Sequence, residues 1–146
     1  MSVQPKRVLF VCTSNVARSQ VAAAYFNKFF PEGHADSAGT VVEQEDQTII
    51  DYGAVTTPKV LAEEGIDATN FRRHQVTQAM LAGYDKIVVM ADKATLPDWL
   101  RNHPKFEYWE IFDPRVADSN VTRAVFEQIR AKVMQLVEDC RREVQA

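Results

Sequence analysis

The stretch VLFVCTSNVARS, residues 8–19, decides the fold that we expect. Its first five residues are β-branched, aromatic or otherwise apolar, which is typical of a strand buried on both faces. Polar residues interrupt this run at 13–15, and an Ala-rich, helix-favouring stretch follows from Arg18 to Phe30, ended by Pro31 and Gly33. The first thirty residues therefore predict a strand, a tight loop and a helix.

The same alternation continues along the chain. Further strands are expected at residues 34–38, 86–90 and 107–112, and helices at 58–64, 77–83, 96–101 and 119–144. Thr57 is expected to cap the 58–64 helix and Gly65 to end it. Strands that alternate with helices imply parallel strands joined by right-handed crossovers. We therefore expect one α/β domain over residues 1–146, a three-layer sandwich whose four-stranded parallel sheet is flanked by helices.

Composition removes several classes of function. The chain has 146 residues, of which 46% are hydrophobic, and carries a net charge of −3. This apolar fraction can build a core, and the acidic balance argues against a nucleic-acid-binding module, which is usually basic. The two cysteines, Cys12 and Cys140, are too few for a disulfide scaffold or a four-cysteine metal site, and no two of the three histidines have close metal-binding spacing.

The apolar segments are too short for a membrane. No stretch approaches the roughly 18 unbroken apolar residues of a membrane helix. The early apolar run, residues 8–12, is also too short for the core of a signal peptide. Scarce cysteine suits a reducing compartment. We therefore expect a cytoplasmic protein with neither a membrane nor a nucleic acid as partner.

Chemically reactive side chains follow the expected strands. Ligands of parallel α/β sheets bind at the carboxyl ends of the strands. Cys12, residues 37–40, Asp92 and Asp113 stand at the ends of the four strands in turn. A thiol and carboxylic acids are therefore expected at the same edge of the sheet.

The loop between the first strand and the first helix favours an anion. Its backbone N–H groups are unpaired at a helix N-terminus, where the helix dipole is positive. Arg18 adds a cation that can hold two oxygens of a phosphate. The same field favours the thiolate form of Cys12, which supplies a nucleophile. A cysteine with an arginine six residues later is a weak signal alone, but the strand before it and the helix after it strengthen it.

These residues resemble the N-terminal signature of the low-molecular-weight protein tyrosine phosphatases and the related arsenate reductases. The sequence DSAGT at 36–40, residues 58–67, residues 85–90 and the Asp113-Pro114 pair are similar to later motifs of that family, in the same order. The resemblance implies a phosphatase I-like fold with strand order 2-1-3-4. It also implies a metal-independent cysteine phosphatase of the CX5R type that acts on phosphotyrosine or a related phospho-residue.

The resemblance also implies a role for each matching residue. Cys12 would attack phosphorus, and Asp113 would act as general acid and then as general base. Ser19 would hydrogen-bond the thiolate, and Asn15, supported by Ser37, would hold the shape of the loop. Phosphate or another oxyanion would bind to the loop residues Thr13, Ser14, Asn15, Val16, Ala17 and Arg18. No metal or other cofactor is implied, and the substrate would be a phosphorylated protein or a small phosphomonoester.

The sequence departs from the family pattern at a few positions. Ser14 replaces a common glycine, and Ala17 replaces the second cysteine of many members. Because Cys140, on the last helix, is expected to pack in the core of the protein, an oxidised Cys12 would have no intramolecular partner. Arg115 stands where tyrosine-directed members often carry an aromatic residue, whereas Val16 is similar to those members and differs from the threonine associated with phosphoarginine. The identity of the substrate stays open.

Other functions remain as alternatives. One is an arsenate reductase that uses an external thiol, another is a phosphocarrier, and a third is a non-catalytic phosphate-binding module. Arg18 and Asp113 speak against a carrier, which must keep its phosphoryl group. Elsewhere in the sequence, the pair Arg72-Arg73 is interpreted as solvated, and residues 41–56 as a long loop whose acidic cluster is solvated. The aromatic residues expected in the core or an interface are Phe10, Phe26, Phe29, Phe30, Trp109 and Phe112.

Overall fold

The computed structural model describes residues 6–114 and 117–145. Their helices and strands are β1 (Arg7–Cys12), α1 (Arg18–Phe29), β2 (His34–Gly39), α2 (Ile49–Tyr52), α3 (Thr56–Glu63), η1 (Ala79–Gly83), β3 (Lys86–Val89), η2 (Lys93–Thr95), α4 (Asp98–Arg101), β4 (Phe106–Tyr108) and α5 (Ser119–Gln145), where η marks a 3-10 helix. The alternation of strands and helices that the sequence predicts is confirmed.

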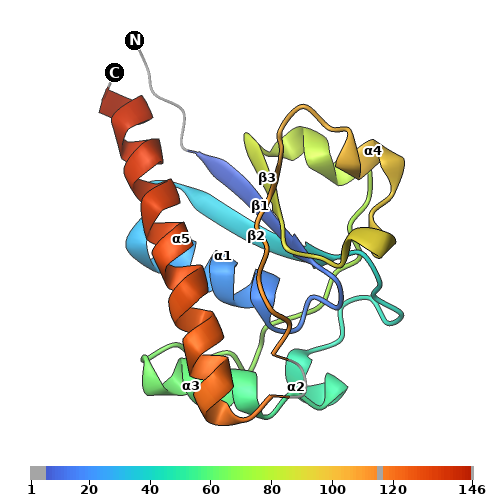
Figure 1. Ribbon diagram of the computed structural model, residues 1–146, viewed down its shortest axis with the longest axis vertical. Coiled ribbons are helices and arrows are strands. Elements are labelled where there is room, and N and C mark those ends of the chain that lie inside the picture. Colours follow the sequence, from blue (N-terminus) through green and yellow to red (C-terminus); the bar gives the residue numbers. More distant parts are fainter. Residues whose placement is uncertain (1–5, 115–116, 146) are drawn as a thin grey trace.

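The four strands form one parallel sheet in the order β2-β1-β3-β4 (Figure 1). This is the predicted order, with β1 at the centre. The register sets Cys12 opposite Gly39 and Val11 opposite Val89. Because all strands run in one direction, their carboxyl ends share one edge, as expected for a ligand-binding edge.

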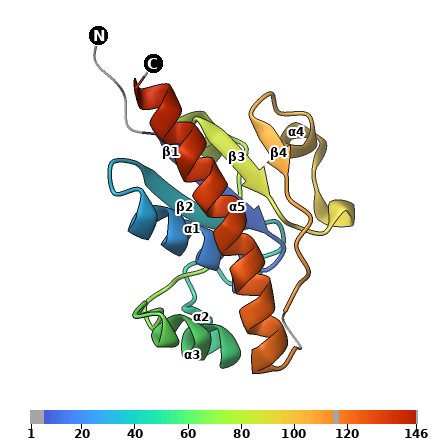
Figure 2. The ribbon, with the colours of Figure 1, turned by 60° about the vertical axis from the view of Figure 1, so that its left-hand side comes forward.

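Both faces of β1 are covered, which explains its unbroken apolar sequence. Val8 and Phe10 pack in the cluster that contains α1 and α5, whereas Leu9 and Val11 pack in the cluster that contains η1 and α4. Figure 2 shows α5 lying across the sheet beside α1. The predicted three layers are therefore present, with β1 in the middle layer.

The long C-terminal helix α5 buries a stripe of apolar residues at helical spacing, except at its start. Val125, Ile129, Val133, Val137 and Cys140 are all buried. Val121 is 42% exposed, and the neighbouring Thr122 is buried in its place. Among the residues that the structure describes, no helix combines the length and hydropathy needed to cross a bilayer.

Some predicted element bounds are wrong. The segment 41–56, predicted as a loop, contains the short helix α2. Thr48 caps the start of α2, because its Oγ accepts a hydrogen bond from the Asp51 N–H. Gly53, with φ of +108°, ends it. Thr57 lies inside α3 and is buried, so it is not the cap, although Gly65 with φ of +78° does follow the end of the helix. The sequence therefore predicts the end of α3 at Gly65 correctly, but it does not predict the four-residue helix α2.

The last strand is also shorter than predicted. β4 ends at Tyr108, and after Trp109 the chain leaves the sheet toward the helices. Ile111 is buried in the cluster that contains α1 and α5, whereas Phe112 is 62% exposed and lies outside the core. This departure from the sheet brings Asp113 toward the end of β1.

Candidate active site

The loop after β1 is tied to both neighbouring strands. The backbone N–H groups of Thr40 and Val41, at the end of β2, donate to the carbonyls of Cys12 and Thr13. On the β3 side, the Thr13 Oγ accepts a hydrogen bond from the N–H of Asp92 at 2.9 Å. The loop is therefore fixed at the carboxyl edge of the sheet before α1 begins.

Asn15 gives the loop its turn. Its φ of +56° lies in the left-handed region, which Asn tolerates better than most residues, so the loop forms without a glycine. Its buried side chain donates to the Ser19 Oγ at 2.7 Å and accepts from the His74 N–H at 2.8 Å. Ser37 does not line the cavity described below and borders a separate hollow with Gln20 and His74.

The sulfur of Cys12 is held by a directed hydrogen bond. The Cys12 Sγ and the Ser19 Oγ are 3.0 Å apart. Because the Ser19 Oγ already accepts a proton from the Asn15 amide, its own hydroxyl proton is available for the sulfur. The Ser19 hydroxyl can therefore donate to the sulfur and hold it in place.

Arg18 is buried, and other strands set its orientation. Its Nη1 donates to the carbonyls of Met90, just after β3, and Ile111, after β4, at 2.5 and 3.3 Å. Its Nη2 is 3.6 Å from a carboxylate oxygen of Asp113. With Nη1 held in this way, the remaining N–H groups of the guanidinium are available for oxygens of a ligand.

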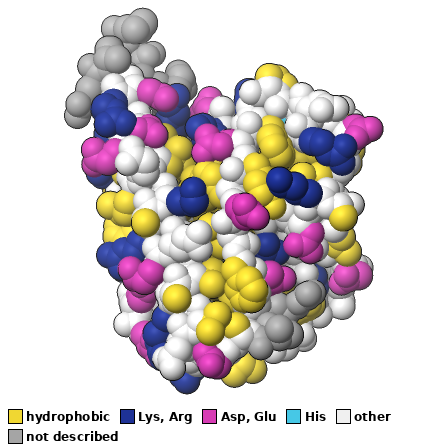
Figure 3. All heavy atoms as spheres, viewed as in Figure 1, with side chains coloured by type: hydrophobic (Ala, Val, Ile, Leu, Met, Phe, Trp, Pro, Cys, Tyr) yellow, Lys and Arg dark blue, Asp and Glu magenta, His cyan; other side chains and the backbone are white. Residues whose placement is uncertain are grey.

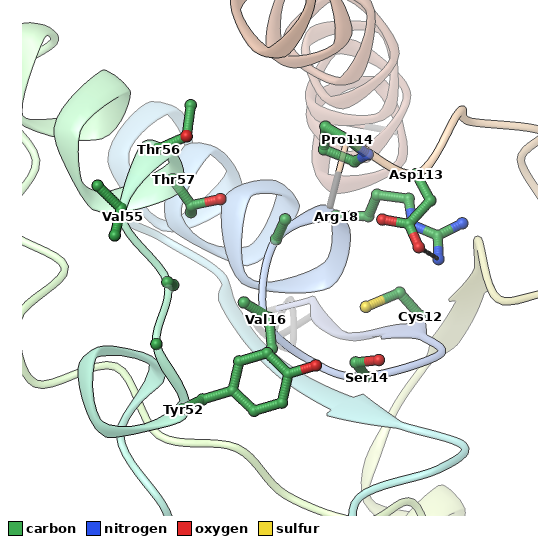
Figure 4. Close-up of a pocket in the computed structure, with 13 residues that line it drawn as sticks. Cys12, Ser14, Val16, Arg18, Tyr52, Val55, Thr56, Thr57, Asp113 and Pro114 are labelled. Atoms are coloured by element: carbon green, nitrogen blue, oxygen red, sulfur yellow. Dashed lines mark ion pairs between the residues drawn. The ribbon is translucent and has the colours of Figure 1, made fainter. Parts of the chain in front are cut away.

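These groups surround a cavity of about 210 Å³ (Figure 4). The phosphate loop, defined here as residues 12–18, contributes Cys12, Ser14, Val16, Ala17 and Arg18. Asp113 and Pro114 come from the segment after β4, and residues 52–57 form a further wall. The arrangement brings a nucleophile, a cation and a carboxylic acid to one small space, while Thr13, Asn15 and Ser19 act from behind the loop.

Two residues outside the predicted set of site residues contribute to this site. Tyr52 borders the cavity from the end of α2, and Arg73 contacts the phosphate loop from outside. The interpretation of Arg73 as solvated is wrong, since its side chain is 1% exposed, whereas that of Arg72 is 50% exposed. Neither residue sits in a periodic segment, so no pattern could have marked it.

The acidic cluster, Glu43, Glu45 and Asp46, is exposed, as interpreted, and it also makes directed contacts with the rest of the chain. A backbone hydrogen bond from Gln75 and one from the His74 side chain lower the pKa of Glu45. Glu43 approaches Arg73 at 3.6 Å. These contacts attach the segment before α2 to residues 73–75, which also support Asn15.

The two thiols of the chain lie at opposite ends of the sheet. Cys140 borders a hollow with Lys6 and Val8, near the start of β1, whereas Cys12 ends that strand. Four residues of strand separate Val8 from Cys12 by about 13 Å. A disulfide needs Cα atoms within about 7 Å. Cys12 and Cys140 therefore cannot pair in this fold, and burial raises the pKa of the Cys140 thiol.

Comparisons with known proteins give one family. The family model described as low molecular weight phosphotyrosine protein phosphatase matches residues 7–146. A probable low molecular weight protein-tyrosine-phosphatase, EpsP of Ralstonia nicotianae, is 30% identical over 119 residues, which are 75% of this chain and 78% of that protein. A putative member from Klebsiella pneumoniae is 30% identical over 84 residues, 57% of this chain, and the match spans only about half of that relative, 54%.

Solved structures agree with this fold. The YwlE arginine phosphatase of Geobacillus stearothermophilus superposes with a TM-score of 0.79 and 27% identity, over 95% of each chain. An arsenate reductase of Archaeoglobus fulgidus gives a TM-score of 0.72 and 30% identity, over 90% of this chain and 98% of that one. Similar proteins thus share the fold and differ in what their names say they act on.

Proposed function

Because this chain belongs to the low molecular weight phosphotyrosine protein phosphatase family, we propose that it hydrolyses phosphomonoesters through a phosphocysteine on Cys12. The observation that carries the proposal is the cavity in which the Cys12 sulfur, the Arg18 guanidinium and the Asp113 carboxyl meet. The cation and the loop N–H groups supply the positive charge that phosphoryl transfer requires, so the mechanism needs no metal.

In the first step, the Cys12 sulfur donates an electron pair to phosphorus. An S–P bond forms as the bond between phosphorus and the ester oxygen breaks. Asp113 transfers its proton to the departing oxygen, which leaves as an alcohol or phenol. Arg18 and the N–H groups of residues 13–18 stabilise the charge on the three equatorial oxygens.

In the second step, the Asp113 carboxylate removes a proton from water. The water oxygen bonds to phosphorus while the S–P bond breaks, which releases inorganic phosphate and restores the Cys12 thiolate. The hydrogen bond from Ser19 stabilises that thiolate as a leaving group. Asp113 thus serves as acid and then as base, and Arg18 keeps its place through both steps.

The walls of the cavity favour an aromatic ester. Apolar side chains line part of the cavity, Val16 from the phosphate loop and Tyr52, Ala54, Val55 and Pro114 from beyond it. A phenyl ring stacks or packs on such a surface, whereas a hydrated alkyl ester gains less. We therefore propose phosphotyrosine, in a protein or as a small aryl phosphate, as the substrate. Arg115, which stands where tyrosine-directed members of the family often carry an aromatic residue, lies outside the described residues.

The surroundings of the protein follow from the same chemistry. A catalytic thiolate needs a reducing compartment, so we place the protein in the cytoplasm. On the face shown in Figure 3, basic and acidic side chains are interspersed, which gives that face no continuous basic surface for nucleic acid. The proposed partners are the phosphorylated substrate and free oxyanions, without a nucleic acid or a membrane.

A substrate panel in the presence of a chelator tests the proposal. Wild type is expected to hydrolyse p-nitrophenyl phosphate and a phosphotyrosine peptide, and to act more slowly on phosphoserine and phosphoarginine peptides. Arsenate reduction with an added thiol is the competing activity, which the similarity to an arsenate reductase favours. Thiol-dependent arsenate reduction without ester hydrolysis would reject the phosphatase. A stable phosphocysteine without turnover would identify a carrier, and binding alone a phosphate-binding module.

Replacing Asp113 by Asn is expected to lower kcat/KM for phenyl phosphate by about 100- to 1,000-fold at neutral pH, because the leaving oxygen then lacks a proton donor. The loss is expected to be smaller for p-nitrophenyl phosphate, whose leaving group departs as a stable anion. Phosphocysteine is expected to accumulate, since water also loses its base, and intact-protein mass spectrometry would detect it. An equal loss for both esters would contradict the assignment of Asp113.

Replacing Gly39 by Ala is expected to lower kcat/KM by about 100-fold through displacement of the phosphate loop. An added Cβ would lie 2.7 Å from the Thr13 carbonyl oxygen and 3.0 Å from the Asn15 Cβ. Such overpacking costs about 1–3 kcal/mol of folding stability, measurable by urea unfolding. Gly83→Ala is the control, because its Cβ would meet nothing within 4 Å. Similar kinetics for the two variants would show that the loop tolerates the shift.

A further inference from the structure

The buried side chain of Arg73 joins two parts of the active site. Its Nε donates to the Ser14 carbonyl of the phosphate loop at 3.0 Å, and its guanidinium carbon lies 4.2 Å from the centre of the Tyr52 ring. The Gln47 Oε1 accepts from its Nη1 at 2.7 Å. One planar group therefore contacts the loop that would hold the phosphate and the ring that borders the rest of the cavity.

The contact with Ser14 orients a peptide of the phosphate loop. The C=O and N–H of a trans peptide point in opposite directions. With the Ser14 carbonyl directed at Arg73, the N–H of the next residue, Asn15, points away from Arg73. A change at residue 73 therefore acts on the orientation of a loop amide without touching the substrate.

The contact with Tyr52 fixes the aromatic wall. Tyr52 ends a helix of only four residues and is 40% exposed, so its own helix restrains the ring little. In Figure 4 the ring lies beside Val16 and Ser14, at the border of the cavity. A guanidinium over one face of the ring attracts it and leaves less freedom for it to move away.

The cost of burying this cation argues against a role in stability alone. Arg73 is 1% exposed, its closest carboxylate oxygen, from Glu43, is 3.6 Å away, and its Nη2 has no hydrogen-bond acceptor among the described residues. A buried charge with incomplete partners stabilises a fold less than an apolar side chain of similar size. The feature that an apolar side chain could not reproduce is the simultaneous hold on Ser14 and Tyr52.

We propose that Arg73 is a positioning residue that locks the Tyr52 ring against the phosphate loop and thereby sets the preference for aryl over non-aryl phosphates. This inference rests on the proposed function, since it assigns the wall of that same site. It differs from the mechanism in that Arg73 acts through Ser14 and Tyr52 and has no contact with the reacting atoms.

Two ligands distinguish the contact of Arg73 with the Tyr52 ring from its contact with the Ser14 carbonyl. Benzylphosphonate carries an aryl group, whereas inorganic phosphate does not, and both dissociation constants can be measured by calorimetry without turnover. Arg73→Met is expected to weaken benzylphosphonate about 30-fold and phosphate about threefold, so that the preference falls about tenfold, within the range of a partly desolvated cation–π contact. Arg72→Met is the matched control, because the Arg72 side chain is half exposed, and it is expected to change both constants less than twofold.

A double-mutant cycle tests the coupling to Tyr52. Tyr52→Leu alone is expected to lower the aryl preference, and adding Arg73→Met to it is expected to lower the preference no further. Equal weakening of both ligands by Arg73→Met, or the same tenfold fall in the Tyr52→Leu background, would overturn the proposal. Either result would mean that Arg73 does not act through the Tyr52 ring.

A second variant covers the case in which Arg73→Met does not fold. Gln47→Ala leaves Arg73 and its contacts with Ser14 and Tyr52 in place and removes only the acceptor of its Nη1. It is therefore expected to lower the aryl preference by about threefold, less than Arg73→Met does. An unchanged preference in Gln47→Ala overturns the role of Arg73. Folded wild type that binds neither ligand would instead reject the proposed function itself.

Discussion

Replacing Cys12 by Ser is expected to abolish turnover, with kcat lowered on the order of 10⁴-fold or more. Serine keeps the size and the hydrogen-bonding pattern of the site, but a hydroxyl does not ionise near neutral pH. The contact with Ser19 at 3.0 Å stabilises a thiolate, and this one donor cannot produce an alkoxide. The substitution therefore removes the nucleophile and leaves the anion site.

The measurement combines kinetics with binding. Hydrolysis of p-nitrophenyl phosphate should fall to the background rate, while inorganic phosphate should bind within about threefold of wild type, because Arg18 and the loop N–H groups remain. Cys140→Ser is the control, since that thiol is buried near the far end of β1, and it should keep full activity below its unfolding temperature. Substantial activity in Cys12→Ser would refute the phosphocysteine mechanism.

The edge on which the site lies could be predicted from the sequence because local patterns determine it. A strand that packs on both faces must be apolar throughout, and residues 8–12 satisfy this requirement. Parallel strands then bring their carboxyl ends together, and the segment after β4 carries Asp113 to the same cavity as Cys12. Arg18 pairs with Asp113 there, its Nη2 lying 3.6 Å from the carboxylate.

The wall of the cavity could not be predicted, because contacts between distant and irregular segments determine it. α2 has four residues, too few to show a helical period. Arg73 is buried by its contacts with Ser14, 59 residues away in the sequence, and with Gln47, 26 residues away. A pair of adjacent arginines gives no sign that one is buried and the other exposed. Ser37, to which the resemblance assigns a supporting role for Asn15, borders a separate hollow with Gln20 and His74 and does not line the cavity.

Replacing Arg18 by Lys is expected to lower kcat on the order of 10³-fold, although the positive charge is kept. The guanidinium is held by two carbonyls through Nη1, which directs its other N–H groups in fixed directions. An ammonium is a compact charge on a flexible stem, so it cannot satisfy the Met90 and Ile111 carbonyls and also present a planar pair of donors to phosphate. The transition state, which carries charge on three equatorial oxygens, is expected to lose more than the bound substrate.

The pattern of loss distinguishes this role from a general effect on the fold. In Arg18→Lys, the dissociation constant of inorganic phosphate should rise only about tenfold while kcat falls far more, because ground-state attraction depends mainly on charge. Urea unfolding should show a loss of about 1–3 kcal/mol from the two buried carbonyls left without a donor. If kcat were kept and only KM rose, Arg18 would bind substrate without stabilising the transition state, and the loop N–H groups would have to carry the charge that forms during phosphoryl transfer.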